Sequence, residues 1–172
     1  MKIFYYENYK DIFPELQGSQ LTDALIVKAA GEFGIDDEDV HVIRDHRNKP
    51  YLAPRSRYRL SVSVSHCMNT FACIISHSNC GIDIQNPKKT DIGKIAGRFF
   101  SIGEQKLVDE GGTDTFYRLW TMKEAYAKFT GRGIGEVLAG TDVTQLQNVL
   151  FTEYRLDNGM YCAVCMPGEE TK

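Results

Sequence analysis

Hydrophobic positions recur with helical spacing over residues 116–129. This run contains no Pro or Gly, Thr113 or Asp114 can cap its start, and Gly131 stands where a left-handed terminal residue is favoured. At about 100° per residue, its apolar positions fall on one wide arc. The positions on this arc are Phe116, Leu119, Trp120, Met122, Tyr126, Ala127 and Phe129. The pattern therefore predicts a long amphipathic helix.

Charged residues interrupt the apolar arc of this helix. Lys123 falls inside the arc, Glu124 lies at its edge, and Lys128 follows one turn later. A lysine on a packed face needs an anionic partner or a route to water, and a carboxylate at the boundary is a candidate metal ligand or base. Alternatively, Lys123 snorkels, and Glu124 and Lys128 form an ordinary pair worth a few tenths of a kcal/mol. The helix alone leaves both interpretations open.

The first half of the chain has one helical pattern and several strand patterns. We expect a helix over roughly 20–33, capped by Ser19 and ended by Gly31 and Gly34. Residues 60–66 alternate cleanly between apolar and polar positions, which predicts a strand with one polar face. Strands are expected at 2–7, 39–44, 60–66 and 70–76.

The second half begins with a short strand at 81–85, in which Asp83 lies between two isoleucines. Aspartate is depleted in strands, and its carboxylate should point away from the isoleucine face, so we expect Asp83 to have a function. Ser101 and Glu104 form a capping box that opens a short helix to about 109. The other expected elements are a helix at 91–100, a turn at 111–112, and a hairpin of 149–156 and 160–166 around 157–159.

Glycine-rich residues 131–135 follow a helix instead of opening one, so we interpret them as a stop and a turn. The order of elements favours an α+β fold, with helices packed against antiparallel sheet. The chain has 172 residues, of which 42% are hydrophobic, enough for one domain or two small fused halves.

The charge pattern excludes several classes of function. A net charge of −3, with no dense basic run, gives no footprint for nucleic acid or for a membrane surface. The first residues become charged too soon for a signal peptide, and no apolar run approaches a membrane span, so we expect a cytoplasmic protein.

Cys162 and Cys165 have zinc-site spacing but lie in an apolar run, so we expect all five cysteines to be structural, reduced thiols.

Two segments of the first half could contact phosphate. Arg44, Arg47 and Lys49 belong to a basic turn over 44–52, which could bind phosphate or simply be a solvated hairpin tip. His66 ends the alternating strand, where it could contact a phosphate or a base, or be structural.

Three segments, taken in order and spacing, resemble the signature of 4′-phosphopantetheinyl transferases of the surfactin-synthetase-activating type. The segments are Val64-Ser-His66, Gly81-Ile-Asp-Ile-Gln85 and Trp120-Thr-Met-Lys-Glu-Ala-Tyr-Ala-Lys128. Residues 98–104 and 48–51 are also similar to family segments. The resemblance implies two similar α/β halves in a pseudo-twofold arrangement, with 1–80 as the N-terminal half and 81–172 as the half carrying the metal and catalytic motifs.

The resemblance also implies a reaction. The 4′-phosphopantetheine group of coenzyme A would be transferred to a serine of an apo acyl or peptidyl carrier protein, with Mg²⁺ and with release of adenosine 3′,5′-bisphosphate. We expect a monomer that binds no nucleic acid and no membrane.

The resemblance assigns roles to individual residues. Asp83 and Glu124 would bind the metal, with Glu124 also the base, and Lys123 would stabilise the diphosphate and the leaving nucleotide. A larger set would hold coenzyme A: Lys49, Ser65, His66, Asp83, Lys123 and Lys128. Glu104 and Trp120 are expected beside these ligands.

One position departs from the family pattern, because many relatives have glutamate where this chain has Gln85. An amide coordinates without adding negative charge, so we expect weaker metal affinity, with a water between Gln85 and the ion. This departure keeps a second hypothesis open, a weakened relative that binds coenzyme A or a carrier protein without turnover. A third, a coenzyme A-dependent acyltransferase, would need a diphosphate loop opening a helix, which the sequence lacks.

Overall fold

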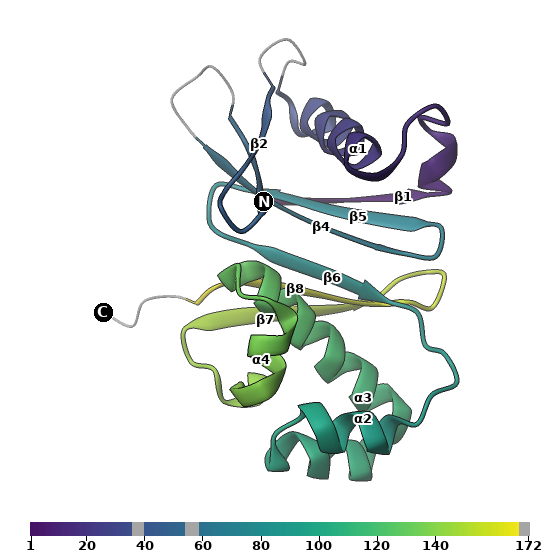
Figure 1. The fold of residues 1–172 in the computed structure, drawn as a ribbon, viewed down its shortest axis with the longest axis vertical. Coiled ribbons are helices and arrows are strands. Elements are labelled where there is room, and N and C mark those ends of the chain that lie inside the picture. Colours follow the sequence, from purple (N-terminus) through teal and green to yellow (C-terminus); the bar gives the residue numbers. More distant parts are fainter. Residues whose placement is uncertain (36–39, 54–58, 169–172) are drawn as a thin grey trace. The chain divides into compact units, whose positions relative to one another are not determined.

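The computed structural model describes residues 1–35, 40–53 and 59–168 of the chain. The chain divides into two compact units, Met1–Cys80 and Gly81–Lys172 (Figure 1). Each unit combines helices with an antiparallel sheet, which confirms the mixed α and β composition expected from the order of elements. None of the helices in the described part of the chain is long and apolar enough to cross a membrane.

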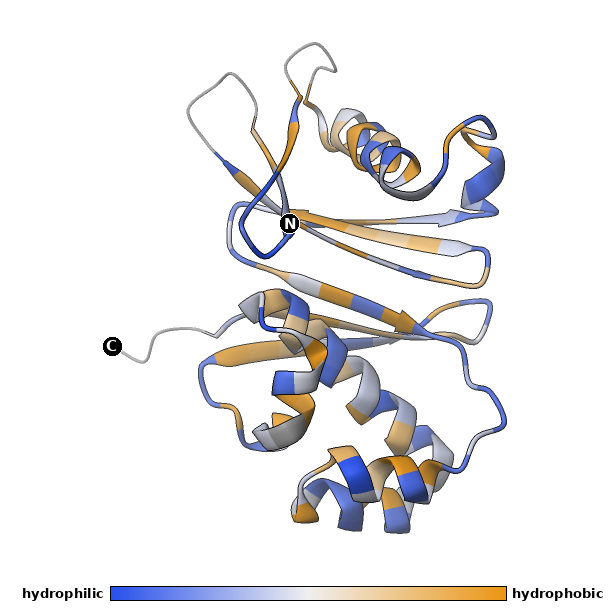
Figure 2. Ribbon diagram, viewed as in Figure 1, coloured by the Kyte–Doolittle hydropathy of each residue, from blue (hydrophilic) through white to orange (hydrophobic). Residues whose placement is uncertain are grey.

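The first unit is a five-stranded antiparallel sheet covered on one face by a helix (Figure 1). The sheet order is β1 (Lys2–Glu7), β5 (Thr70–Ser76), β4 (Leu60–Cys67), β3 (Pro50–Leu52) and β2 (Val42–Arg44). Helix α1 (Gly18–Phe33) follows the 3₁₀ turn η1 (Tyr9–Asp11). Leu25 and Ile26 of α1 pack on Val62 and Phe71 of the sheet, so the core lies between helix and sheet. Figure 2 shows the apolar stretch of β5 that forms part of this layer.

One expectation for the first unit needs correction. Ser19 does not cap α1, because the helix begins at Gly18 and its cap position, Gln17, makes no side-chain cap hydrogen bond. On the expected polar face of β4, the serines Ser61, Ser63 and Ser65 are all buried. The strand expected over 39–44 is seen as β2 from Val42, and residue 39 lies outside the described residues.

The second unit has a three-stranded antiparallel sheet in the order β6 (Gly81–Gln85), β8 (Tyr161–Pro167) and β7 (Val149–Arg155). Its other elements are α2 (Ile92–Phe99), α3 (Ile102–Thr130), α4 (Ile134–Gly140) and the 3₁₀ turn η3 (Val143–Gln145). Helix α3 packs against β6 and β8, as Figure 1 shows.

Helix α3 joins the two helices that the sequence separates. The capping box of Ser101 and Glu104 is present, and Gly131 ends the helix with a φ of 69°, so both predicted ends are confirmed. The expected boundary at 111–112 is confirmed, because Gly112, with a φ of 63° and a ψ of −144°, leaves the helical conformation and divides α3 into two helices at a kink. Residues 131–135 end α3 as expected, but the expectation that they do not open a helix is wrong, since α4 starts at Ile134.

The core of the second unit is built on aromatic residues. Trp120 stacks on Phe116 and Phe100, with ring centroids 5.9 and 6.4 Å apart, and Phe99 meets its edge. All five cysteines are free, and four of them are buried, as expected for structural thiols. Burial raises the pKa of the Cys73 and Cys80 thiols, which keeps them protonated.

Candidate functional site

The carboxylate of Asp83 is the centre of the candidate site. It belongs to β6 and is only 3% exposed. Lys128 Nζ on α3 lies 2.7 Å from Asp83 Oδ1, and the Gln85 amide donates a hydrogen bond of 2.9 Å to Asp83 Oδ2. Both oxygens of this carboxylate therefore contact a side chain, one cationic and one neutral.

The alternation of β6 explains this placement. Successive side chains of a strand point to opposite faces, so Asp83 and Gln85 share one face while Ile82 and Ile84 share the other. Both isoleucines are fully buried. The ion pair with Lys128 identifies the Asp83 face as the one that looks onto α3.

Glu124 is the second acid of the site and projects from α3 one turn before Lys128. Its pKa is raised from 4.5 to about 7, chiefly because the half-buried carboxyl is desolvated, and further because Asp83 is negative. Lys128 opposes this shift. The electrostatic interaction means that the carboxyls of Asp83 and Glu124 are neighbours, with one ammonium beside them.

This donor set can be tested against the metal that the sequence predicts. Across the described ranges, no three His, Cys, Asp or Glu side chains converge as a ready-made cation site. Asp83 and Glu124 are two carboxylates, and the amide oxygen of Gln85 is a third possible ligand. Mg²⁺ commonly takes one or two carboxylates, keeps several waters and binds phosphate oxygens, so the set fits such an ion.

Lys123 belongs to a separate, closed network. Its Nζ lies 2.8 Å from Glu104 Oε2, and both side chains are 0% exposed. The ammonium also donates a hydrogen bond to the carbonyl of Thr141 and lies 5.3 Å from the Phe100 ring centre. The sequence rule about a lysine on a packed face therefore identified a real requirement, and Glu104 meets it.

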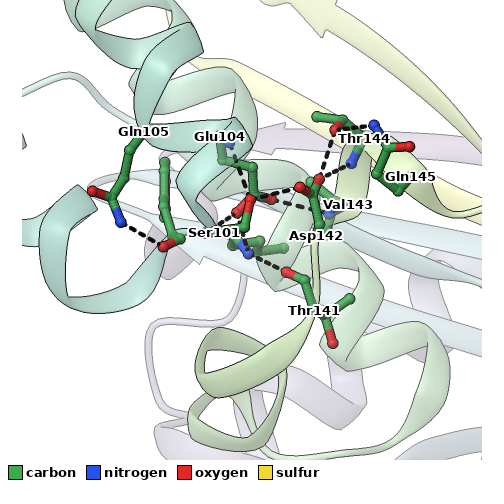
Figure 3. A network of polar contacts seen from close by, with 10 residues as sticks. Ser101, Glu104, Gln105, Thr141, Asp142, Val143, Thr144 and Gln145 are labelled. Atoms are coloured by element: carbon green, nitrogen blue, oxygen red, sulfur yellow. Dashed lines mark hydrogen bonds and ion pairs between the residues drawn. The ribbon is translucent and has the colours of Figure 1, made fainter.

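Glu104 makes more contacts than its cap position requires (Figure 3). Its Oε2 accepts a hydrogen bond of 2.8 Å from the Ser101 amide, and its Oε1 accepts one of 2.9 Å from the Val143 amide. Ser101 in turn donates to Asp142. The network thus ties the start of α3 to its middle and to the segment after α4.

The residues of the first unit that are predicted to bind coenzyme A differ from one another in burial and in contacts. Lys49 is 9% exposed and donates to Asn79 Oδ1 at 2.6 Å and to the Cys80 carbonyl at 3.0 Å. Ser65 is buried, and His66, the next residue of β4, is exposed. Arg44 of the basic turn is held by Asp23 through two hydrogen bonds.

His66 also lines a cavity of about 430 Å³ that sequence reasoning missed. Its ring stacks on Tyr9, with centroids 6.0 Å apart, and Lys10 and the start of α1 at Gly18 complete part of the wall. The contributing residues are far apart in sequence and individually unremarkable, so no local signal could have found the cavity.

The structure therefore brings together four of the predicted residues, Asp83, Gln85, Glu124 and Lys128, within the second unit. Lys123 and Glu104 form their own pair, and Trp120 packs in the aromatic core. Two carboxylates beside a lysine form a donor set that fits a divalent cation together with phosphate oxygens.

Comparison with known proteins agrees with this class. Residues 79–163, which contain the four residues of the site, match the family model of the 4′-phosphopantetheinyl transferase superfamily. The chain is 27% identical to the 4′-phosphopantetheinyl transferase gsp of Aneurinibacillus migulanus, over 93% of this chain and 71% of that protein. It is 28% identical to the 4′-phosphopantetheinyl transferase Sfp of Bacillus subtilis (strain 168), over 94% of this chain and 76% of that protein.

A third relative is matched over a shorter length. Identity to the 4′-phosphopantetheinyl transferase HetI of Nostoc sp. is 34%, over 62% of this chain and 48% of the relative. The chain thus spans about half the length of HetI. Together these matches show that the chain belongs to the 4′-phosphopantetheinyl transferase superfamily, which confirms the family and the enzyme class predicted from the sequence.

Proposed function

We propose that this protein transfers the 4′-phosphopantetheine group of coenzyme A to a serine of an apo acyl or peptidyl carrier protein, with Mg²⁺, and releases adenosine 3′,5′-bisphosphate. The observation that carries the proposal is the pairing of Asp83 with Lys128, next to Glu124, inside the segment that matches the superfamily. Such a reaction breaks one bond of a diphosphate, so the site must neutralise negative charge and accept one proton.

Glu124 is the proposed base. The attacking serine hydroxyl must lose a proton, and a carboxyl with a pKa of about 7 can accept it near neutral pH. Its position at the edge of the buried face of α3 leaves this carboxyl half-buried, in contrast to its enclosed neighbour Lys123. The chain needs no nucleophile of its own, because the carrier protein supplies the serine.

Asp83 and Glu124 would hold the magnesium ion, with Gln85 contributing directly or through a water. Bound Mg²⁺ would neutralise charge on the diphosphate and on the departing phosphate group. Lys128 is already in place beside Asp83, and its side chain is 29% exposed, so it can also contact a phosphate oxygen from the resting structure.

Lys123 has a different starting position. The role predicted from the sequence, contact with the diphosphate and the leaving nucleotide, would require its enclosed ammonium to leave Glu104. In the resting structure Lys123 instead fixes the turn of α3 that carries Glu124. We therefore propose Lys128 as the first contact with the diphosphate, and Lys123 as a residue that reaches it only after a rearrangement.

The nucleotide part of coenzyme A is proposed to bind the first unit. Ser65 and His66 remain the predicted contacts for the 3′-phosphate, and the cavity beside His66 supports this placement. Lys49 would have to leave Asn79 to take part. The pseudo-twofold relation of two similar halves stays a prediction from the resemblance, as do the monomeric state and the cytoplasmic location.

Purified protein, coenzyme A, Mg²⁺ and a panel of apo carrier proteins test the proposal by intact-mass spectrometry. We expect a carrier that gains one phosphopantetheine group. Binding of coenzyme A without an adduct on any carrier would favour the alternative of a weakened relative. An acyl group arriving without the pantetheine arm would favour an acyltransferase and would contradict the proposal.

The Glu124→Gln variant tests the proposed base. We expect the transfer rate to fall about 10²- to 10⁴-fold, because the variant removes a proton acceptor and replaces an anionic metal ligand with a neutral one. The amide keeps the shape of the side chain, so the unfolding midpoint should stay close to that of the parent. Turnover near the parent rate would refute the assignment of Glu124.

A further inference from the structure

Gly81 occupies the helix-facing side of β6. It opens the strand and pairs with Cys165 of β8. Because side chains alternate along a strand, Gly81, Asp83 and Gln85 share one face. This is the face that looks onto α3, as the ion pair between Asp83 and Lys128 shows. Gly81 therefore lies two residues from the acid of the site and on the same surface.

The backbone of α3 touches β6 at Gly81. A Cβ at this position would lie 2.0 Å from the carbonyl oxygen of Ala125 and 2.6 Å from the amide nitrogen of Phe129, whereas ordinary contact begins at 3.4 Å. Both atoms are main-chain atoms, so no rotation of a side chain could relieve the overlap. The glycine is needed for this close approach and not for its own conformation, since its φ is not in the left-handed region.

The two atoms that touch Gly81 belong to specific residues of the helix. Ala125 directly follows Glu124, and Phe129 directly follows Lys128. The contact therefore fixes the height of α3 above the strand at the two turns that present the base and the ammonium. Asp83 carries the shortest acidic side chain and is buried, so it can meet these groups only while the helix stays this close.

Small residues continue this close approach on the neighbouring strand. Ala163 of β8 pairs with Asp83 and is 1% exposed. It clusters with Ala125 of α3, which is 0% exposed. Small residues thus line this interface between helix and sheet on both strands beside the site.

The geometry points to Gly81 as a positioning residue that sets the separation of Asp83 from Glu124 and Lys128. This inference rests on the proposed function, in which these three side chains bind a cation and a diphosphate. A methyl group at Gly81 would force the two backbones apart by about 1 Å or more, a misplacement that can weaken a built site by up to about 100-fold.

Binding of Mn²⁺ in the presence of coenzyme A, followed by the electron paramagnetic resonance signal of free Mn²⁺, tests this inference in the full chain. We expect Gly81→Ala to raise the Kd for Mn²⁺ by about tenfold to 100-fold. Ala163→Val, which adds bulk to the same interface from β8, should raise it by less. Ile82→Ala is the matched control, because it destabilises the same strand from the opposite face and should leave the Kd near that of the parent.

A rescue variant separates positioning from general loss of structure. In the Gly81→Ala background, Asp83→Glu adds one methylene and should recover part of the lost affinity, whereas Asp83→Glu alone should weaken binding. An unchanged Kd in Gly81→Ala, or an equal loss in Ile82→Ala, would overturn the inference. If Gly81→Ala does not fold, an unchanged Kd in Ala163→Val would overturn it.

A crystal structure of Gly81→Ala keeps this inference distinct from the proposed function. A parent that binds no Mn²⁺ with coenzyme A would count against the proposed function. The positioning role would then be decided by the coordinates, because the Asp83 and Glu124 carboxyls should be farther apart in the variant than in the parent by about 1 Å. An unchanged separation would contradict it.

Discussion

Two lysines of helix α3 form ion pairs of nearly equal length with carboxylates, and the two pairs differ in exposure and in partners. Lys123 lies 2.8 Å from Glu104, and Lys128 lies 2.7 Å from Asp83. The first pair is 0% exposed on both sides, whereas the lysine of the second is 29% exposed. The length of the contact therefore does not distinguish a structural ion pair from one that belongs to the candidate site.

The partners of the two carboxylates explain the difference. Glu104 also accepts hydrogen bonds from the backbone amides of Ser101 and Val143, which are fixed by the fold. Asp83 contacts the side chains of Gln85 and Lys128, which can rotate away when a ligand arrives. A pair enclosed among main-chain groups stabilises the structure, whereas a pair with a partly exposed lysine can exchange partners.

The largest effect should come from breaking the enclosed pair. Lys123→Met leaves Glu104 buried without its counter-charge, so the free energy of unfolding should fall by about 3–5 kcal/mol. Lys128→Met removes a partly exposed lysine and should lower it by about 1 kcal/mol. Urea denaturation followed by the fluorescence of Trp120 measures both. Equal losses in the two variants would erase the distinction drawn between the pairs.

For ligand binding we expect the opposite order, with a larger effect from replacing Lys128 than from replacing Lys123. Lys128→Met should raise the Kd for coenzyme A with Mg²⁺ by about tenfold to 100-fold, since a hydrogen bond to a charged group contributes about 1.5–3 kcal/mol. Lys128→Arg, which keeps the charge, should lose less. Isothermal titration calorimetry measures these affinities. An affinity for coenzyme A that Lys128→Met leaves unchanged would show that Lys128 does not contact a phosphate.

A pH series sharpens the comparison at Glu124, which lies between the two lysines in sequence. Its pKa in the folded chain is about 7, above the ordinary 4.5. Between these values the folded chain holds more protons than the unfolded chain, so the contribution of this carboxyl to stability falls as pH rises through the window. Mg²⁺ needs the ionised form, so its affinity should rise by up to tenfold per pH unit towards about pH 7 and then level off.

Thermal unfolding with and without Mg²⁺ and coenzyme A, from about pH 5 to about pH 8, checks this prediction. Glu124→Gln is the control, because it removes the titrating group and should flatten the dependence. A stabilisation by Mg²⁺ that does not change with pH would contradict the placement of Glu124 at the metal.

The smallest expected effect concerns the neutral partner of Asp83. Gln85→Glu adds a negative charge beside Asp83 and should lower the Mg²⁺ concentration for half-maximal transfer by a few-fold. Gln85→Met, which removes the polar group, should not lower it. An unchanged Mg²⁺ requirement in Gln85→Glu would mean that the neutral amide of Gln85 does not weaken metal binding in this chain.

Local rules were sufficient where a residue's environment is set by its neighbours in sequence. The alternation of β6 placed Asp83 away from its isoleucines, and the capping box located the start of α3. Local rules failed where distant segments decide. Glu104 was fully explained by its cap, so nothing in its surroundings indicated that Lys123 and Val143 would share it.

Two further failures have the same origin. The burial of the β4 serines could not be predicted, because a pattern of polar positions does not show what covers them in the folded chain. No packing role was predicted for Gly81, although a glycine inside a strand can mark the close approach of another backbone. Only the packing of α3 shows that the fold needs the small size of Gly81 and not its conformational freedom.

The distribution of thiols offers an experimental handle on the first unit. Cys67 is half-buried, whereas the other four cysteines are buried, and it directly follows His66 in β4. A maleimide dye added under native conditions should therefore attach to this one position without any engineering of the sequence. Neighbouring side chains of a strand point to opposite faces, so the dye would lie beside His66 but outside the cavity, and its emission would test the proposed arrival of the nucleotide there.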